Sequence, residues 1–157
     1  MREEPRARHG AGRRIEDDAG VRAVIRDAHR VAVLGMKAES HAAAPAFYVP
    51  AFLQQRGTAV VPVPVHHPDV MMILGEPVYR RVADVPGDID IVLVFRRPEH
   101  IPAHVPDLIA KRPATVWFQT GIRNEGAASA LVTAGIDVVQ DRCALVELRA
   151  ARQAARS

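Results

Sequence analysis

The stretch Val31-Ala32-Val33-Leu34-Gly35-Met36-Lys37 decides the fold class of this chain. Four consecutive aliphatic residues are typical of a strand that is buried on both faces in the middle of a parallel sheet. Gly35 permits a sharp turn and lets a ligand approach the backbone. With the helix predicted over residues 42–55, this gives a strand–turn–helix unit, the arrangement in which doubly wound folds bind phosphate groups. A buried strand and turn without a ligand is the alternative, because one glycine is a weak signal.

The bulk properties favour a single cytoplasmic domain. The chain's 157 residues are enough for one domain with its own core, and its hydrophobic fraction of 48% is ordinary for a soluble globule. Its apolar runs are far shorter than the roughly 20 residues of a membrane span, and the charged N-terminus lacks the apolar segment of a secretory signal. A single cysteine, Cys143, excludes an internal disulfide framework. We therefore expect no membrane partner.

The net charge of +3 does not indicate a nucleic-acid-binding protein. Many of the arginines lie in the two ends of the chain, and four Phe, two Tyr and one Trp are too few rings for a base-stacking platform. The interior pair Arg96-Arg97 is different, because it directly follows a predicted strand. A planar guanidinium at a strand end suits phosphate oxygens, although solvated surface charge is the alternative.

Strand and helix patterns alternate along most of the chain. Buried strands are predicted at residues 31–34, 58–63, 90–95, 115–119 and 136–140, and helices at residues 15–29, 42–55, 98–111, 124–134 and from residue 144 onward. Pro102 and Pro106 predict that the helix over residues 98–111 is bent or starts late. A short helix is expected at residues 70–74, and a short extended piece at residues 78–80 could form an edge strand.

This alternation predicts an α/β fold with three layers, a Rossmann-like doubly wound sheet that is mostly parallel, five main strands and a possible short edge strand. We expect one domain over residues 15–150, between a mobile N-terminal tail at residues 1–14 and a C-terminal tail at residues 151–157. If the strand at residues 90–95 pairs on the far side of the first strand, the turns after these two strands face each other. Ligands of doubly wound sheets bind at that point of strand-order reversal.

These facing turns make the first candidate site. Gly35 would give close approach, Lys37 a point charge, and Arg96 or Arg97 a fork for phosphate oxygens. Gly35→Val should then abolish ligand binding with only a modest loss of thermal stability. The dinucleotide fingerprint is absent, since one glycine stands where three are needed, and no acid follows the strand at residues 58–63. An NAD-dependent dehydrogenase is therefore not expected.

The sequence gives weaker support for a metal site or a catalytic nucleophile than for a phosphate site. His100 and His104 stand four apart and His66-His67 are adjacent, but there is no paired cysteine and no His-Glu-x-x-His pattern. Surface histidines are the favoured interpretation, and no metal is expected. Cys143 is either an inert core residue or a reactive thiol at the carboxyl edge, activated by the N–H groups of the next helix and by Arg142.

Six segments follow one another at separations typical of one protein family: Val31-Ala-Val-Leu-Gly35, Val60-Val-Pro-Val63, Leu74-Gly-Glu-Pro-Val-Tyr79, Asp90-Ile-Val-Leu-Val-Phe-Arg-Arg-Pro98, Val116-Trp-Phe-Gln-Thr-Gly-Ile-Arg-Asn124 and Val138-Val-Gln-Asp-Arg-Cys143. Over about residues 30–148 the chain resembles the small stand-alone bacterial CoA-binding proteins. Their fold is similar to that of the CoA-binding domain of the succinyl-CoA synthetase alpha subunit. Two departures are the Gly-Met-Lys turn, where the family commonly has Gly-Ala-Ser, and the missing Asn-Pro after the second strand.

The resemblance implies that CoA lies along the carboxyl edge of the sheet. The loop of Gly35, Met36, Lys37 and Ala38 would approach the diphosphate. The adenosine end would lie near Pro62, Val63 and Pro64. The pantetheine path would be lined by residues of two further loops, namely Phe95, Arg96 and Arg97 together with Gln119, Gly121 and Asn124. Cys143, placed at the same edge by the predicted topology, completes the candidate ligand-binding set.

The leading functional hypothesis is non-covalent binding of CoA or acyl-CoA without catalysis, because no nucleophile–base pair, carboxylate pair or metal set is legible. One alternative is a subunit or minimal enzyme of an acyl-CoA- or nucleotide-dependent reaction. Another is a CoA-sensing regulatory module that acts on a partner through the basic tails. A homodimer or an unidentified protein partner is left open.

Overall fold

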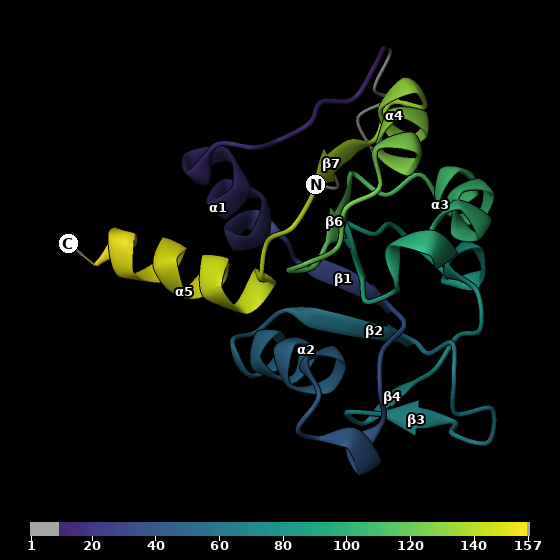
Figure 1. Ribbon diagram of the computed structural model, residues 1–157. Helices are drawn as coiled ribbons and strands as arrows, with labels where there is room; N and C mark the ends of the chain where they lie inside the picture. Colours follow the sequence, from purple (N-terminus) through teal and green to yellow (C-terminus); the bar gives the residue numbers. More distant parts are fainter. Residues whose placement is uncertain (1–9, 157) are drawn as a thin grey trace.

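A five-stranded parallel sheet stands between two helical layers in the computed structural model of this chain, which describes residues 10–156 (Figure 1). The strand order is β2-β1-β5-β6-β7, and every neighbouring pair is parallel. The strands are β1 (Arg30–Leu34), β2 (Ala59–Val63), β5 (Ile91–Val94), β6 (Thr115–Phe118) and β7 (Asp137–Val139). The predicted doubly wound α/β fold is confirmed, with β1 and β5 adjacent at the point where strand order reverses.

Successive side chains of the strands point to opposite faces of the sheet and form two separate hydrophobic cores. Val31 and Val33 of β1 pack toward the layer of α1 (Asp18–Asp27), α2 (Pro45–Gln55) and α5 (Ala144–Ala155). Ala32 and Leu34 pack toward the opposite layer, formed by α3 (Val105–Lys111) and α4 (Glu125–Thr133). Because both faces of the sheet are covered, its central strands are apolar throughout, which explains the continuous aliphatic runs of the sequence.

Prolines and caps set where the helices start. Asp17 accepts a hydrogen bond from the Gly20 N–H at 2.9 Å and caps α1. Before α3 the chain forms two 3₁₀ turns, η3 (Pro98–His100) and η4 (Pro102–His104), so the predicted late start of this helix is confirmed. The turn η1 (Glu39–His41) precedes α2, which begins only at Pro45 and keeps Pro50 in its interior.

The region after β2 departs from the sequence prediction. The short helix expected at residues 70–74 is wrong: β3 (Met72–Ile73) and β4 (Glu76–Pro77) form a separate antiparallel hairpin. Leu74 and Gly75 make its turn with φ values of 54° and 75°, the left-handed pair that a tight hairpin requires. The piece at residues 78–80 is not a strand, although the Tyr79 N–H donates to the Pro62 carbonyl at 3.0 Å. The turn η2 (Val82–Asp84) leads on to β5.

Parts of both segments that the sequence predicted as tails belong to the folded domain. The Ile15 N–H donates to the Val138 carbonyl at 2.9 Å, and the Val138 N–H donates to the Arg13 carbonyl at 2.9 Å. Residues 13–15 thus cover the edge of β7, which would otherwise expose unpaired backbone groups. At the other end, α5 continues to Ala155. Residues 1–9 and 157 of the predicted tails lie outside the described residues.

Gly35 is required where β1 meets β5. Its φ is +84°, and a Cβ atom at this position would lie 2.2 Å from the Phe95 carbonyl oxygen. The Gly35 N–H donates to the Val63 carbonyl at 2.9 Å, and the Phe95 N–H donates to the Leu34 carbonyl at 2.9 Å. The backbone of Phe95, directly after β5, fills the space that any side chain would need, so this glycine is imposed by the fold itself.

Gly35→Ala should therefore be strongly destabilising, and Gly35→Val more so, in contrast to the modest loss expected from the sequence. The left-handed φ costs about 1–2 kcal/mol, and displacing the Phe95 carbonyl adds to it. Gly57→Ala is a matched control, because Gly57 has a φ of +96° but nothing within 4 Å of its would-be Cβ. Urea denaturation should show a markedly larger loss for Gly35→Ala than for Gly57→Ala. Equal losses would contradict the close approach of Phe95.

Candidate functional site

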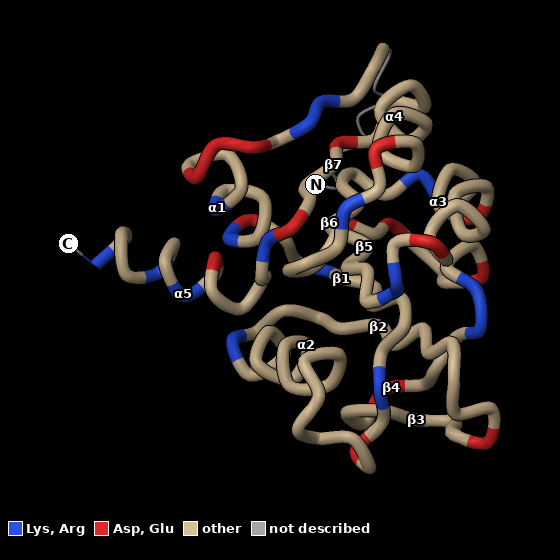
Figure 2. Tube along the Cα trace, viewed as in Figure 1, with Lys and Arg blue, Asp and Glu red and all other residues tan. Residues whose placement is uncertain are grey.

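The turns after β1 and β5 lie against each other at the carboxyl edge of the sheet, as the sequence predicted. Gly35 is the contact: its would-be Cβ lies 2.2 Å from the Phe95 carbonyl oxygen and 3.2 Å from Cδ of Arg96. Lysine and arginine residues follow both strands at this end of the sheet (Figure 2). The point of strand-order reversal is therefore cationic, as a phosphate-binding site requires.

Two backbone N–H groups of the turn after β1 lack an acceptor within residues 10–156, and both belong to buried residues, Met36 (1% exposed) and Ala38 (5% exposed). The N–H groups of Gly35 and Lys37 donate to the carbonyls of Val63 and Ala46. Unpaired N–H groups next to Lys37 can bind an anion. The helix predicted over residues 42–55 does not start at this turn, because α2 begins only at Pro45.

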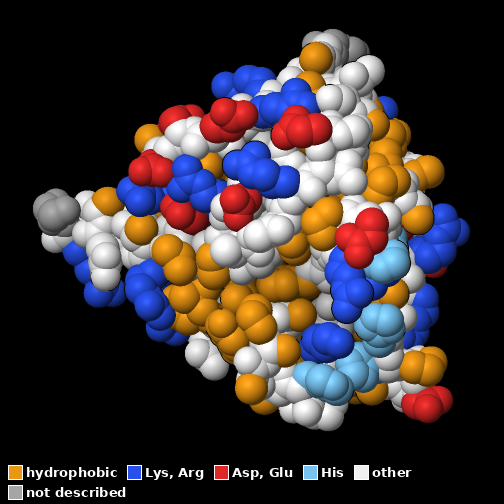
Figure 3. Space-filling view, viewed as in Figure 1, with side chains coloured by type: hydrophobic (Ala, Val, Ile, Leu, Met, Phe, Trp, Pro, Cys, Tyr) orange, Lys and Arg blue, Asp and Glu red, His pale blue; other side chains and the backbone are white. Residues whose placement is uncertain are grey.

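Histidines from neighbouring loops lie beside these cations, as Figure 3 shows at the right of the face in view. The rings of His41 and His67 meet edge to face, with centroids 4.9 Å apart. Burial, and then the charges of His41, Lys37 and His66, lower the pKa of His67. Arg80 fixes this loop by donating to the carbonyls of His67, Pro68 and Val70 at 3.2, 3.1 and 2.6 Å.

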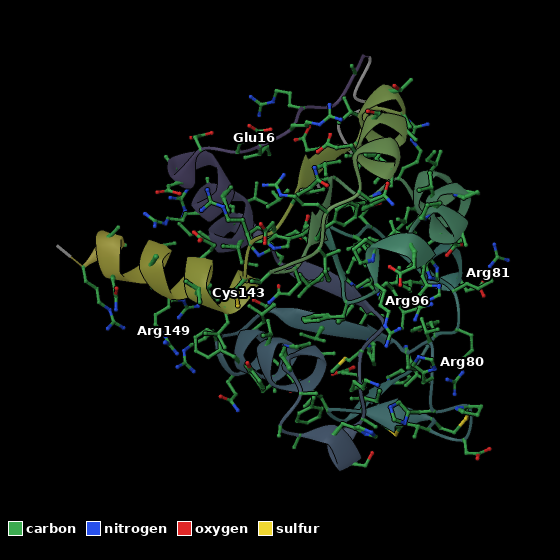
Figure 4. The ribbon with its side chains drawn as sticks, viewed as in Figure 1. Glu16, Arg80, Arg81, Arg96, Cys143 and Arg149 are labelled. Carbon is green, nitrogen blue, oxygen red and sulfur yellow. The ribbon has the colours of Figure 1, made fainter. Side chains whose placement is uncertain are left out.

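Arg96 is held in place by His104. Its Nε donates to Nε2 of His104 at 3.2 Å, and Figure 4 places Arg96 beside the end of β1. Arg97 is exposed beside it. Burial, and then the charge of Arg96, lower the pKa of His104, which keeps the imidazole a neutral acceptor. The sequence pattern had assigned His104 only to a surface helix, and no local signal linked it to Arg96.

The residues after β2 contribute through the backbone. Pro62, Val63 and Pro64 are all buried, and the carbonyls of Pro62 and Val63 accept from Tyr79 and Gly35. Pro62 lies in the strand itself, paired with Val33. The sheet tolerates it because β2 is an edge strand.

Two polar residues proposed to line the ligand path are engaged in holding loops together. The Gln119 Oε1 accepts from the Ala144 N–H at 3.2 Å, at the start of α5. The Asn124 Oδ1 caps α4 by accepting from the Ala127 N–H at 2.9 Å, and its Nδ2 donates to the Pro98 carbonyl at 2.9 Å. These side chains set the positions of the loops. Gly121 is exposed, and its N–H donates to Asp141 at 2.6 Å.

Cys143 lies at the start of α5, partly exposed (Figure 4). Arg142, which the sequence analysis expected to add positive charge beside this sulfur, has acidic partners of its own. The Arg142 guanidinium is paired with Asp18 at 2.8 Å and Glu147 at 3.3 Å, and it also donates to the Glu16 carbonyl at 2.9 Å. The helix N-terminus is also partly satisfied, because Gln119 accepts from Ala144.

Two cavities lie away from the contact between the turns after β1 and β5. One of about 300 Å³ is lined by Arg14, Glu16, Arg123 and Arg142, and another of about 410 Å³ lies near Asp90 and Asp137. Within residues 10–156 no group of three or more His, Cys, Asp or Glu side chains could hold a metal ion, and no helix is long and apolar enough to cross a membrane.

The lowered pKa of His104 predicts a pH dependence of stability. The unfolded chain takes up this proton near its ordinary pKa of about 6.5, at a higher pH than the folded protein does. Stability is therefore lost as the pH falls through about 6.5. Urea unfolding at about pH 7.5 and 5.5 should show a smaller acid-induced loss for His104→Gln than for wild type. An equal or larger loss in the variant would contradict this assignment.

Comparison with known proteins shows which family and which solved structures this chain is similar to. Residues 29–149 match the model of a family described as "CoA binding domain". The chain is 29% identical over 129 residues to the uncharacterized protein YneT of Bacillus subtilis, covering 80% of this chain and 89% of that protein. It is 37% identical to a solved structure from Thermus thermophilus, cell-free ID.343, with a TM-score of 0.78 and coverage of 87% and 99%. A hypothetical protein from Pyrococcus horikoshii OT3 is 26% identical, with a TM-score of 0.77 and coverage of 97% and 99%.

Proposed function

The chain belongs to the CoA-binding domain family, and from this premise we propose that it binds CoA or acyl-CoA non-covalently along the carboxyl edge of the sheet. The observation that carries the proposal is the cationic contact between the turns after β1 and β5. The turn after β1 supplies Lys37 and the unpaired N–H groups of Met36 and Ala38, and the turn that lies against it supplies Arg96. Such a set suits the diphosphate of CoA, which is an anion with several acceptor oxygens.

The rest of the ligand extends along the edge in both directions. The adenosine lies toward the end of β2 and the loop of His67, where cationic and imidazole groups gather. The pantetheine arm runs past Phe95 and Arg97 to the loop of Gln119 and Asn124. In the strand order β7 lies next to β6 at the edge of the sheet, and Cys143 follows β7 in the chain. The thiol end therefore points toward Cys143.

We propose binding without a reaction of this chain's own. The side chains of Gln119 and Asn124 hold helix starts and loop carbonyls, so they serve the shape of the edge. Ser40 Oγ and Nδ1 of the adjacent His41 are hydrogen-bonded at 2.9 Å, but both residues are exposed and no ion pair of His41 with a carboxylate is found within residues 10–156. The protein would then act as a cytoplasmic CoA carrier, sensor or subunit.

Isothermal titration of the purified protein with CoA tests the proposal. We expect saturable binding of CoA and none of NADH. Lys37→Ala should weaken CoA binding by roughly tenfold or more, because a charge-assisted phosphate contact contributes about 1.5–3 kcal/mol. Arg26→Ala is the matched control, since Arg26 is exposed on α1 and pairs with its neighbour Asp27. Absence of CoA binding to wild type would overturn the proposed function.

CoA should bind more tightly than dephospho-CoA. The cations at this edge exceed what a diphosphate alone requires, so the 3′-phosphate has partners as well. Its loss should weaken binding by about 1.5–3 kcal/mol, or roughly 10- to 150-fold. Calorimetry with both ligands checks this difference. Equal affinities would show that no cation reads the 3′-phosphate.

If the thiol end of CoA reaches Cys143, the two should form a mixed disulfide when CoA disulfide is supplied as oxidant, whereas an inert Cys143 should not react. The Cys143 thiolate attacks one sulfur, the disulfide bond of CoA disulfide breaks, and one CoA thiol leaves. Intact-mass analysis should show one CoA adduct that reductant reverses and that Cys143→Ser lacks. If wild type gains no such adduct, the thiol end of CoA does not reach this cysteine.

A further inference from the structure

The Arg96 guanidinium is fixed at one end and open at the other. Its Cδ lies 3.2 Å from the would-be Cβ of Gly35, against the backbone of the neighbouring turn. Its Nε donates to the Nε2 of His104 at 3.2 Å. Among residues 10–156 no acid forms an ion pair with Arg96, and no hydrogen bond of its terminal Nη groups is found. Two forked donor groups therefore remain for an anion at the switch point.

The acceptor of this hydrogen bond is an uncharged group. His104 is half-buried at the end of η4, where burial and the charge of Arg96 disfavour its protonation. The other charged or titratable groups that face it are Asp107 and His100. The Asp107 carboxylate is engaged elsewhere, because it accepts from Arg81 at 3.0 Å and from the Val82 N–H at 2.9 Å. His104 thus remains neutral, with a lone pair on Nε2 for Arg96.

This pairing differs in effect from the common arginine–carboxylate pair. A carboxylate at the position of His104 would align Arg96 but would also neutralise it and compete with a bound phosphate. A neutral imidazole aligns the guanidinium and leaves its full charge available. Holding one arginine rotamer in advance also lowers the entropy lost when the ligand binds.

We propose that His104 is a positioning residue for phosphate recognition: it holds Arg96 so that the two Nη groups face the diphosphate of CoA. This inference rests on the proposed function and adds a residue that makes no contact with the ligand. Its effect on binding should therefore pass entirely through Arg96. A double-mutant cycle isolates such an effect.

The experiment measures the CoA affinity of wild type, Arg96→Ala, His104→Leu and the double variant by calorimetry at about pH 7.5. Arg96→Ala should weaken binding roughly 10-fold or more. His104→Leu should weaken it about 5-fold in the wild-type background but less than about 2-fold in the Arg96→Ala background. His104→Gln, which retains an acceptor, should bind within about 2-fold of wild type. His100→Leu, an exposed histidine of the same segment, is the matched control and should leave the affinity unchanged.

The outcomes separate this inference from the function on which it rests. If wild type binds no CoA, the proposed function fails and the inference fails with it. If CoA binds and His104→Leu matches wild type, or weakens binding equally with and without Arg96, the positioning role is overturned while the proposed function stands. Melting temperatures verify that each variant folds. If His104→Leu does not fold, the CoA affinities of His104→Gln and of a second apolar variant, His104→Met, are compared instead. Near-wild-type affinity in the glutamine variant together with a loss in the methionine variant supports the inference, and equal affinities overturn it.

Discussion

The contact between the backbones of β1 and β5 is the constraint on which the rest of the structure depends. Gly35 turns with a φ of +84° directly beneath the Phe95 carbonyl, so the two strands end at the same level. This brings the turn that carries Lys37 against the turn that carries Arg96, although about 60 residues of sequence separate them. The cationic point of strand-order reversal therefore follows from strand pairing, and the glycine is selected by the fold before any ligand is considered.

The polar side chains of the carboxyl edge divide into two groups. Gln119, Asn124 and Arg80 hold backbone groups of neighbouring loops, so they define where the loops lie. Arg96 keeps its charge because its partner is an imidazole. Internal hydrogen bonds build the edge, and a small number of unneutralised cations make it attractive to an anion. A family built on one fold can change ligand contacts at such an edge while keeping the loop-holding bonds intact.

The sequence predicted the features that repeat along the chain. Aliphatic runs such as the one at Val31–Leu34 and the glycines and prolines at element ends were sufficient for the alternation of strands and helices and for the three layers, whereas the pairing of β1 with β5 was stated only as a condition. The hairpin at residues 72–77 was missed, because strands of two residues have no periodicity and the region was interpreted as a helix. The pairing of residues 13–15 with β7 was missed because it depends on an edge that exists only after folding. His104 was assigned to the surface, since its partner Arg96 is brought to it by the turns η3 and η4 rather than by helical spacing. The placement of the ligand-contact residues stays a prediction.

Hydrogen–deuterium exchange with and without CoA is the most direct measurement of the central claim that the ligand lies along the carboxyl edge. The account predicts slower exchange in the turns at residues 35–41 and 95–104 and in the loop at residues 119–124, with little change at the amino edge. The unpaired N–H groups of Met36 and Ala38 should show the largest effect. Protection confined to the cavity near Asp90 and Asp137, with none in the turns after β1 and β5, would contradict it.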